Sequence, residues 1–248
     1  MDSWLLTGNQ YGLLLGSSLV TIQILVYSFA LGIVLSLVVG VGRLSRHAWV
    51  RGISLVFVEL ARGISSIVLL FVVAIALPIL FGLDQANLIL LATIALGINM
   101  GGYGAEIIRG AIQSVPKGQT EAAISLNLTP FQRLRHVVLP QAMTVILPPL
   151  GNLTIEILKG TALVSLVGTT DIMQMARNIR QQQLAEAVGT LPGLYLNVLI
   201  LYFVLAQVIN LLFKLAERRN EARYRGGPAL TGSELAPLTA AANRGGNR

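Results

Sequence analysis

The sequence contains no cysteine and only two histidines among its 248 residues, so it has little with which to bind a metal ion. Without cysteine, neither a disulfide bond nor a cysteine-ligated metal or redox centre is possible. His47 and His136 are too few, and too far apart in sequence, to build a histidine site for a metal. We therefore expect no metal site in this chain.

Charged residues are also scarce. Asp, Glu, Lys and Arg together make up 12% of the residues, whereas an average soluble domain has roughly 25%. The hydrophobic share is 54%, and the mean hydropathy is +0.72. So few charges cannot coat a water-soluble globule of this size, and the composition indicates a chain that is surrounded by lipid.

Five apolar segments are long enough to cross a membrane, which takes about 20 mostly apolar residues in a helix. They cover approximately residues 13–41, 53–80, 88–108, 139–167 and 191–215. The fourth segment contains helix-breaking residues, and we expect it to be interrupted at Pro148, Pro149, Gly151 and Gly160. The sequence thus predicts an all-α polytopic membrane protein with five transmembrane helices.

The basic residues gather on one side of these spans. Most lie between the first and second spans, between the third and fourth, and after the fifth, which are alternate connections and so share one side of the membrane. Because Lys and Arg are enriched in cytoplasmic loops, the N-terminus is expected outside and the C-terminus in the cytoplasm. The net charge of +7 then belongs to the cytoplasmic face, and it requires no nucleic acid as a partner.

The composition changes near the C-terminus. Residues 226–248 are rich in Gly, Pro, Ala, Thr and Asn, which predicts a disordered cytoplasmic tail. Residues 1–225 are expected to form the transmembrane domain.

The loop at about residues 113–140 is the longest predicted cytoplasmic connection, and its pattern indicates helix, turn, helix. Pro116 suits the first turn of a helix over Gln119–Leu126, and Asn127 suits a left-handed residue that ends it. The stretch from Thr129 to Gln132 matches a capping box, which predicts a second helix that ends near Leu139 and Pro140. This loop either packs on its own bundle or offers a short helix to a cytoplasmic partner.

Ionisable and polar residues inside the spans are candidates for function, because they are costly in lipid. Glu156 and Lys159 are three residues apart on one helix face, so they form either a structural ion pair or the wall of a translocation path for a zwitterionic solute. Asn99, Tyr103 and Asn152 could add hydrogen bonds to that path or hold helices together.

Three further patterns concern helix contacts. Glu59 with Arg62, and Glu106 with Arg109, are expected to form structural ion pairs near the cytoplasmic ends of their spans. Gly97 and Gly101 are four residues apart, a spacing that permits two membrane helices to approach closely.

The stretch EAAISLN, followed by VVLPQA, resembles the EAA loop of bacterial ABC importer permeases. That resemblance rests on Glu121, Ala122 and Ala123, together with Leu139 and Pro140. Asn127 stands where the family has glycine, a conservative departure because asparagine tolerates the left-handed conformation. The resemblance implies that these residues couple the membrane domain to an ATPase.

Other segments resemble the polar amino acid uptake subfamily of these permeases, namely residues 58–63, 101–123, 147–152 and 158–168. After Arg62 and Gly63 the subfamily has Thr-Pro, whereas this chain has Ile64 and Ser65. The loop and the stretch GNLTIEILKGTALVSL are similar to the branch of permeases for ectoine and hydroxyectoine.

The resemblance implies a type I ABC importer membrane domain in a bacterial inner membrane. Its partners would be ABC ATPase subunits, a second permease subunit in a homodimer or heterodimer, and an extracytoplasmic solute-binding protein. The sequence has no GxxxxGK[ST] phosphate loop, so ATP and magnesium would be bound by the ATPase and not by this chain.

Three other functions explain the sequence less well. A non-transporting membrane scaffold or assembly subunit would explain the spans but not the EAA-like loop. An ion-gradient-driven secondary transporter usually has repeated halves, and the five predicted spans show none. An enzyme is not expected, because the sequence contains no constellation of nucleophile and base or of metal ligands.

Overall fold

The computed structural model describes residues 6–82, 87–186 and 189–224. These residues form helices and the short connections between them, without a strand in the described ranges. The predicted tail at 226–248 lies outside the described residues. The helical segments, in chain order, are α1 (Gly8–Gly42), α2 (Ala48–Gly63), α3 (Ser66–Phe71), η1 (Val72–Ala76), α4 (Leu77–Phe81), α5 (Leu88–Ser114), α6 (Lys117–Ser125), α7 (Pro130–Arg133), η2 (Leu134–Val138), α8 (Leu139–Thr161), η3 (Ala162–Val167), α9 (Ile172–Glu186) and α10 (Leu191–Tyr224).

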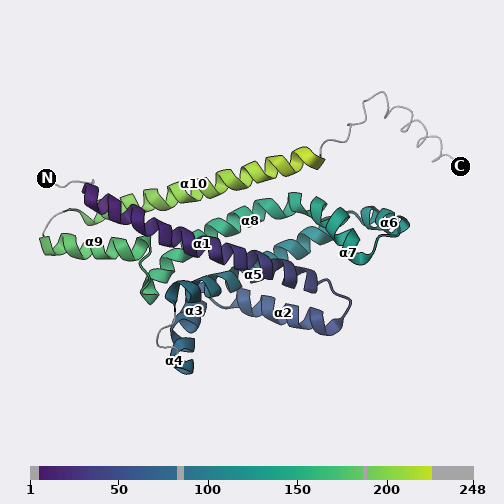
Figure 1. Cartoon of the computed structure of the whole chain (residues 1–248), viewed down its shortest axis with the longest axis horizontal. Coiled ribbons are helices and arrows are strands. Elements are labelled where there is room, and N and C mark those ends of the chain that lie inside the picture. Colours follow the sequence, from purple (N-terminus) through teal and green to yellow (C-terminus); the bar gives the residue numbers. More distant parts are fainter. Residues whose placement is uncertain (1–5, 83–86, 187–188, 225–248) are drawn as a thin grey trace, which may run out of the picture.

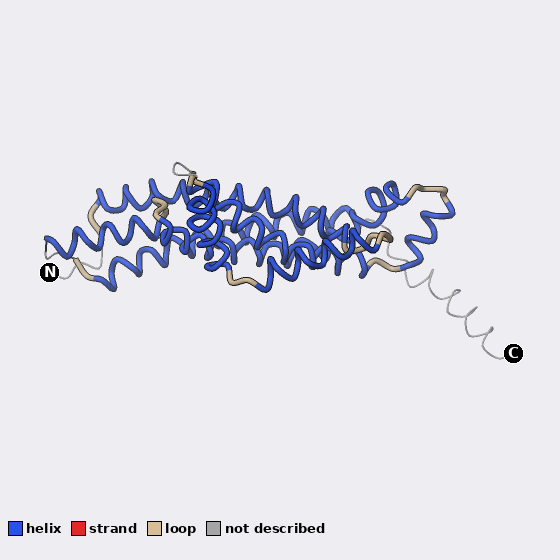
Figure 2. The backbone as a smooth tube through the Cα atoms, turned by 90° about the horizontal axis from the view of Figure 1, so that it is seen from below, coloured by secondary structure: helices blue, strands red, loops and turns tan. Residues whose placement is uncertain are grey.

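The longest helices run along the long axis of the molecule. Figure 1 shows α1, α5, α8 and α10 lying lengthwise, with α9 at one end and the short helices α6 and α7 at the other. Figure 2 shows the same elongated bundle from below, with connecting loops at both of its ends. This arrangement is expected when apolar helices cross a membrane in alternating directions.

Four of the predicted spans are confirmed as long apolar helices, and the second is bent. The helices over 48–63 and 66–81 meet at an angle of 102°. The bend occurs because Ile64 and Ser65 adopt extended backbone conformations, with ψ of 133° and 135°. The expectation of one uninterrupted helix over 53–80 is therefore corrected to a broken span.

The prolines interrupt the fourth span less than expected. The helix of residues 130–167 continues through Pro148 and Pro149, so the predicted break there is wrong. A helix is retained because unwinding it would leave many more backbone groups unpaired in lipid than two prolines do.

Two other prolines, Pro78 and Pro140, each follow a π-helical turn. In both turns the residue before the proline donates its N–H to the carbonyl five residues earlier. The wider turn shifts the carbonyls that a proline ring would otherwise strike, so the chain stays helical.

The bundle is centred on the contact between α1 and α5, where small residues let the two backbones approach. A Cβ atom added at Gly97 or Gly101 would lie 2.7 Å from a side-chain carbon of Leu31 or Leu35. On α1, Gly32 in turn makes room for Met100. The predicted close helix contact at Gly97 and Gly101 is thus confirmed, and any larger side chain there would force α1 and α5 apart.

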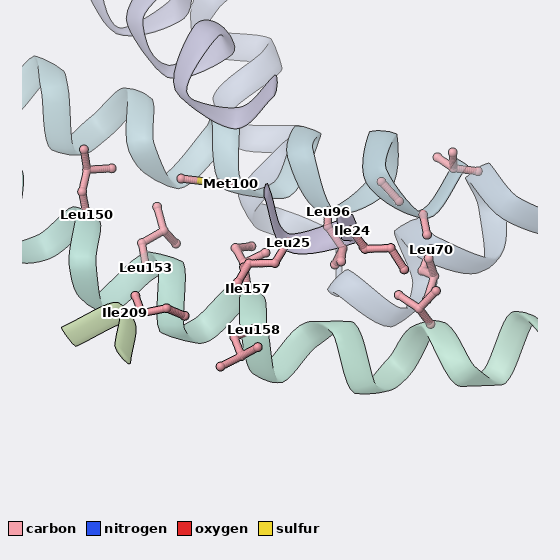
Figure 3. Packing of buried hydrophobic residues seen from close by; sticks show 14 of the residues in the cluster. Ile24, Leu25, Leu70, Leu96, Met100, Leu150, Leu153, Ile157, Leu158 and Ile209 are labelled. Atoms are coloured by element: carbon pink, nitrogen blue, oxygen red, sulfur yellow. The ribbon is translucent and has the colours of Figure 1, made fainter. Parts of the chain in front are cut away.

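Around this contact, one apolar core joins five helices. The buried side chains come from α1, α3, α5, α8 and α10 and from the short segments η1 and η3, and Figure 3 shows ten of them by name: Ile24, Leu25, Leu70, Leu96, Met100, Leu150, Leu153, Ile157, Leu158 and Ile209. In lipid, such contacts stabilise the bundle by close packing rather than by the exclusion of water.

Helix α9, between the fourth and fifth spans, was not among the predicted elements. Asp171 begins it, because its carboxylate oxygens accept the backbone N–H groups of Met173 (3.2 Å) and Gln174 (3.1 Å). The next residue, Ile172, donates its N–H to the hydroxyl of Thr21 on α1 at 3.2 Å. This N-terminal cap therefore also attaches α9 to the bundle.

Asp171 is fully buried. Burial raises the pKa of its carboxyl above the ordinary value, while the two backbone N–H groups and the charge of Arg177 act in the opposite direction. The folded state thus binds a proton at Asp171 more readily than the unfolded state does. Its contribution to stability is fully present below the unfolded pKa, and is lost as the pH rises through the folded pKa.

We expect Asp171→Ala to lower the stability of the protein by about 1 kcal/mol, because the helix loses its cap. Asp171→Asn retains a capping oxygen without the charge, so it should gain stability relative to the wild type as the pH rises from 4 to 7. Thermal unfolding of the full chain in lipid nanodiscs measures both effects. An alanine variant as stable as the wild type would show that the cap does not hold α9.

Candidate coupling loop and translocation path

Helix α6 has the boundaries that the sequence indicates to within two residues, and it ends as expected. Asn127 has φ of 55°, and its N–H bonds the carbonyl of Ile124 at 2.8 Å. The next residue, Leu128, donates its N–H to the carbonyl of Ala123 at 3.1 Å. These two bonds form a Schellman motif, in which a left-handed residue reverses the chain after a helix. The predicted left-handed conformation of Asn127 is confirmed.

The side chains of α6 divide between the bundle and the solvent. Ala123 is buried, whereas Glu121 and Ala122 are exposed. Leu126, directly after α6, and Phe131, at the start of the next helix, expose 73% and 67% of their surfaces at this end of the bundle. Exposed large apolar side chains are typical of protein–protein contacts, and a short helix flanked by them suits a groove in a partner.

The chain after α6 is rigidly connected to the fourth span. The predicted capping box is confirmed, since Gln132 donates its N–H to Thr129 Oγ1 at 3.3 Å and its side chain accepts the Thr129 N–H at 2.9 Å. From Pro130 the helix then continues without a break to residue 167. The predicted helix end at Leu139 and Pro140 is wrong, because the π turn accommodates the proline within the helix.

One side-chain pair joins α6 directly to α8. The amide Nε2 of Gln141 donates a hydrogen bond to Oε1 of Gln119 at 3.1 Å, across 22 residues of sequence. This pair and the continuous helix connect α6 to α8 at two points. Sequence reasoning missed the pair, because two glutamines 22 residues apart carry no local signal of contact.

The same end of the bundle holds a charged cluster. Glu106 on α5 forms a salt bridge with Nη2 of Arg109 at 2.7 Å, which confirms the expected pair. It forms a second salt bridge at 3.2 Å with Nε of Arg43, at the C-terminal end of α1. Arg109 further donates to Gln113 at 2.7 Å. Glu106 therefore fixes the ends of α1 and α5 to each other.

Two of the predicted path residues, both on α5, face α2. Asn99 is 6% exposed, and its Nδ2 donates a hydrogen bond to the carbonyl of Ala61 at 3.2 Å. The guanidinium carbon of Arg62 lies 5.2 Å from the centre of the Tyr103 ring, a cation–π contact. Within the described residues Arg62 therefore binds Tyr103, and the expected ion pair with Glu59 does not form.

The other three predicted path residues lie on one exposed face of α8. Asn152, Glu156 and Lys159 follow at intervals of four and three residues, so they form a stripe along the helix. All three are exposed in the isolated chain, opposite the buried face of Leu153 and Ile157. No ion pair joins Glu156 to Lys159 in the part of the chain that the structure describes.

The fold and this site define a class of protein: a multi-pass helical membrane protein with an exposed polar stripe in one span and a helical loop at one end. Residues 32–222 match the family described as Binding-protein-dependent transport system inner membrane component. The chain belongs to this family.

Individual relatives agree with the family. The chain is 40% identical to the probable amino-acid ABC transporter permease y4tF of Sinorhizobium fredii, over 84% of this chain and 86% of that protein. It is 32% identical to the glutamine transport system permease GlnP of Escherichia coli, over 84% of this chain and 92% of that protein. These relatives are permeases, so the chain is a transport subunit of an ABC transporter and not an enzyme.

Solved structures show the same fold. An amino acid ABC transporter crystallised with histidines matches with a TM-score of 0.73 and 31% identity, covering 84% of this chain and 94% of that one. The MetNI methionine ABC transporter matches with a TM-score of 0.71 at 22% identity, over 87% of this chain and 99% of that one, which supports the fold alone. The predicted type I importer fold is confirmed, and membership of an ABC family implies ATPase partners.

The left-handed turn after α6 provides a test of the loop. Asn127→Gly should leave the loop intact, because glycine adopts positive φ freely. Asn127→Val should destabilise the turn by about 1–2 kcal/mol, since a β-branched residue is strained there. Hydrogen exchange of the α6 amides in the purified full chain measures the difference. Equal protection in the two variants would contradict the importance of this turn.

Proposed function

We propose that the chain is the permease subunit of an importer that carries a polar amino acid, or an amino-acid-like solute such as ectoine, across a bacterial inner membrane into the cytoplasm. Two ATPase subunits, which bind ATP and magnesium, would dock on its cytoplasmic face. An extracytoplasmic solute-binding protein would deliver the solute, and a second permease subunit would complete the path. The names of the relatives, which include permeases for glutamine and cystine, support an amino acid as cargo.

The observation that carries this proposal is that Glu156 and Lys159 lie exposed on a membrane helix and form no ion pair with any of the residues that the structure describes. A charged side chain at the centre of a helix in lipid costs about 2.5–3.5 kcal/mol. Two such residues on the exposed face of α8 therefore need partners from outside the chain. A zwitterionic solute provides both, because its amine pairs with Glu156 and its carboxylate with Lys159.

Asn152 extends the same stripe by one helical turn with a neutral amide. An amide both donates and accepts hydrogen bonds, so it can bind a polar solute without selecting its charge. The side chains of Asn99 and Tyr103 are engaged with α2, and we assign them to holding α5 against α2 beside the path.

For coupling, α6 would sit in a groove of the ATPase and move with it. Its exposed apolar residues, Ile124 and Leu126, supply the contact, and Glu121 supplies a charge at its surface. The Gln119–Gln141 bond and the continuous helix from Pro130 would carry this motion to α8. ATP binding outside the membrane thereby changes the access of the polar stripe inside it.

We expect Glu121→Lys to uncouple transport, because it reverses a charge on the docking helix. The protein should still insert and bind lipid, but stimulation of ATP hydrolysis by loaded binding protein should fall at least about tenfold, equivalent to 1.4 kcal/mol. Glu221→Lys, an equal charge change on the exposed end of α10, is the matched control. Unchanged stimulation in the Glu121 variant, measured in proteoliposomes, would refute the coupling role.

The solute path is tested with Glu156→Gln and Lys159→Gln. Each variant removes one charge-assisted hydrogen bond, worth about 1.5–3 kcal/mol, so uptake should fall roughly 10–100-fold while the binding protein keeps its affinity. Glu186→Gln, in the exposed end of α9, is the control. Uptake of labelled glutamine, cystine and ectoine into proteoliposomes identifies the cargo.

Two results would count against this path. Normal uptake in both variants would place the solute elsewhere. Loss of assembled complex in size-exclusion chromatography would show that Glu156 and Lys159 hold the two permease subunits together instead.

A further inference from the structure

A cavity of about 740 Å³ lies at the basic end of the bundle, apart from the polar stripe of α8. It is enclosed by the end of α1, the connection to α2, the end of α5, α6 and the chain from Pro130 to Val138. Figure 1 shows the α1–α2 connection and α7 at this same end. The proposed solute path does not use this cavity, whereas Thr120 of α6 and Pro130 of the coupling segment line one of its walls.

The part of the cavity that lies toward the middle of the bundle is apolar. Its walls include Val38 and Val41 of α1, Ile112 of α5, and Val138. These residues belong to helices that are long and apolar enough to cross the membrane, so this part of the cavity faces the hydrocarbon. Val38 is 67% exposed, which leaves the cavity open to the side of the bundle, where lipid lies.

The outer part of the cavity is cationic. Arg46 and Arg133 supply its positive charge, His47 also lines it, and among the described lining residues there is no acidic side chain. The Nε atom of Arg133 is buried and has no hydrogen-bond partner in the described part of the chain. A buried guanidinium N–H without an acceptor costs free energy, so an anion in the cavity would stabilise this residue.

Two features at the start of α2 also favour an anion at this site. His47 begins the helix without capping its N–H groups through the side chain, so the positive end of the helix dipole faces the cavity. Two residues further on, Trp49 is 70% exposed, and tryptophan is enriched where the hydrocarbon meets the headgroups of a membrane. The cationic part of the cavity therefore lies at the level of the lipid phosphates.

We propose that this cavity binds an anionic phospholipid of the cytoplasmic leaflet. The phosphate contacts Arg46, just before α2, and Arg133, at the end of α7, and the part of an acyl chain next to the headgroup lies against Val38, Val41 and Val138. A phospholipid fits because the cavity is charged at its outer edge and apolar toward the centre of the membrane. A lipid in the bilayer has its charged headgroup and its acyl chains in the same order. Basic pockets between membrane helices on the cytoplasmic side bind anionic headgroups in this way.

Native mass spectrometry of the purified full-length chain, titrated with phosphatidylglycerol or phosphatidylcholine, tests the proposal. The wild type should retain phosphatidylglycerol in preference to phosphatidylcholine. Arg46→Gln with Arg133→Gln should weaken phosphatidylglycerol binding about thirtyfold, from about 1 kcal/mol for each basic residue near the membrane surface. Arg135→Gln, an exposed arginine of the same segment outside the cavity, should bind like the wild type.

A second variant keeps the test valid if the double substitution disturbs folding. Val50→Phe fills the apolar part of the cavity without changing a charge, and it should also weaken phosphatidylglycerol binding. Glycerol 3-phosphate, which has the charged group but no acyl chain, should not displace the lipid. Equal lipid binding by the wild type and both cavity variants, or displacement by glycerol 3-phosphate at equal concentration, would overturn the proposal.

Discussion

The close contact between α1 and α5 is the interaction on which the rest of the structure depends. The hydrophobic effect gives helices in lipid little driving force to associate. A membrane bundle therefore needs backbones that approach closely and polar groups that form hydrogen bonds between helices. Gly97 and Gly101 supply the first, and the bond of Glu106 to Arg43 supplies the second at the C-terminal ends of α1 and α5. Both α2 and α8 pack against this α1–α5 pair.

In the proposed coupling, α6 and the helix of residues 130–167 move relative to this fixed pair. Helix α6 contacts the bundle through Ala123 and the Gln119–Gln141 bond, and it presents its other residues outward. The long helix of residues 130–167 starts beside α6 and carries the polar stripe within the membrane. A partner that displaces α6 therefore acts on the stripe through one rigid element, which is what an ATP-driven importer requires.

How much the sequence revealed depends on the range of the interactions involved. The turn at Asn127 and the capping box at Thr129 depend on hydrogen bonds between residues three to five positions apart. Such local interactions leave a local sequence pattern, so both could be predicted from the sequence. The bond of Arg43 to Glu106 spans 63 residues and left no local trace. Helix α9 was missed, although Asp171 followed three residues later by Gln174 is the pattern of a helix N-terminus. The predicted break at Pro148 and Pro149 was wrong because a segment in lipid stays helical, whereas the same segment in water would unwind.

The central claim is that α6 and the helix of residues 130–167 move as one body. Because the chain has no cysteine, spin labels can be attached to cysteines placed at Ser125 in α6 and Leu166 at the far end of that helix. Their separation is measured by electron spin resonance in the complex with the ATPase, without nucleotide and with ATP bound. We predict the same distance distribution in both states, and a distribution that shifts with ATP would show that α6 moves independently, contradicting the account.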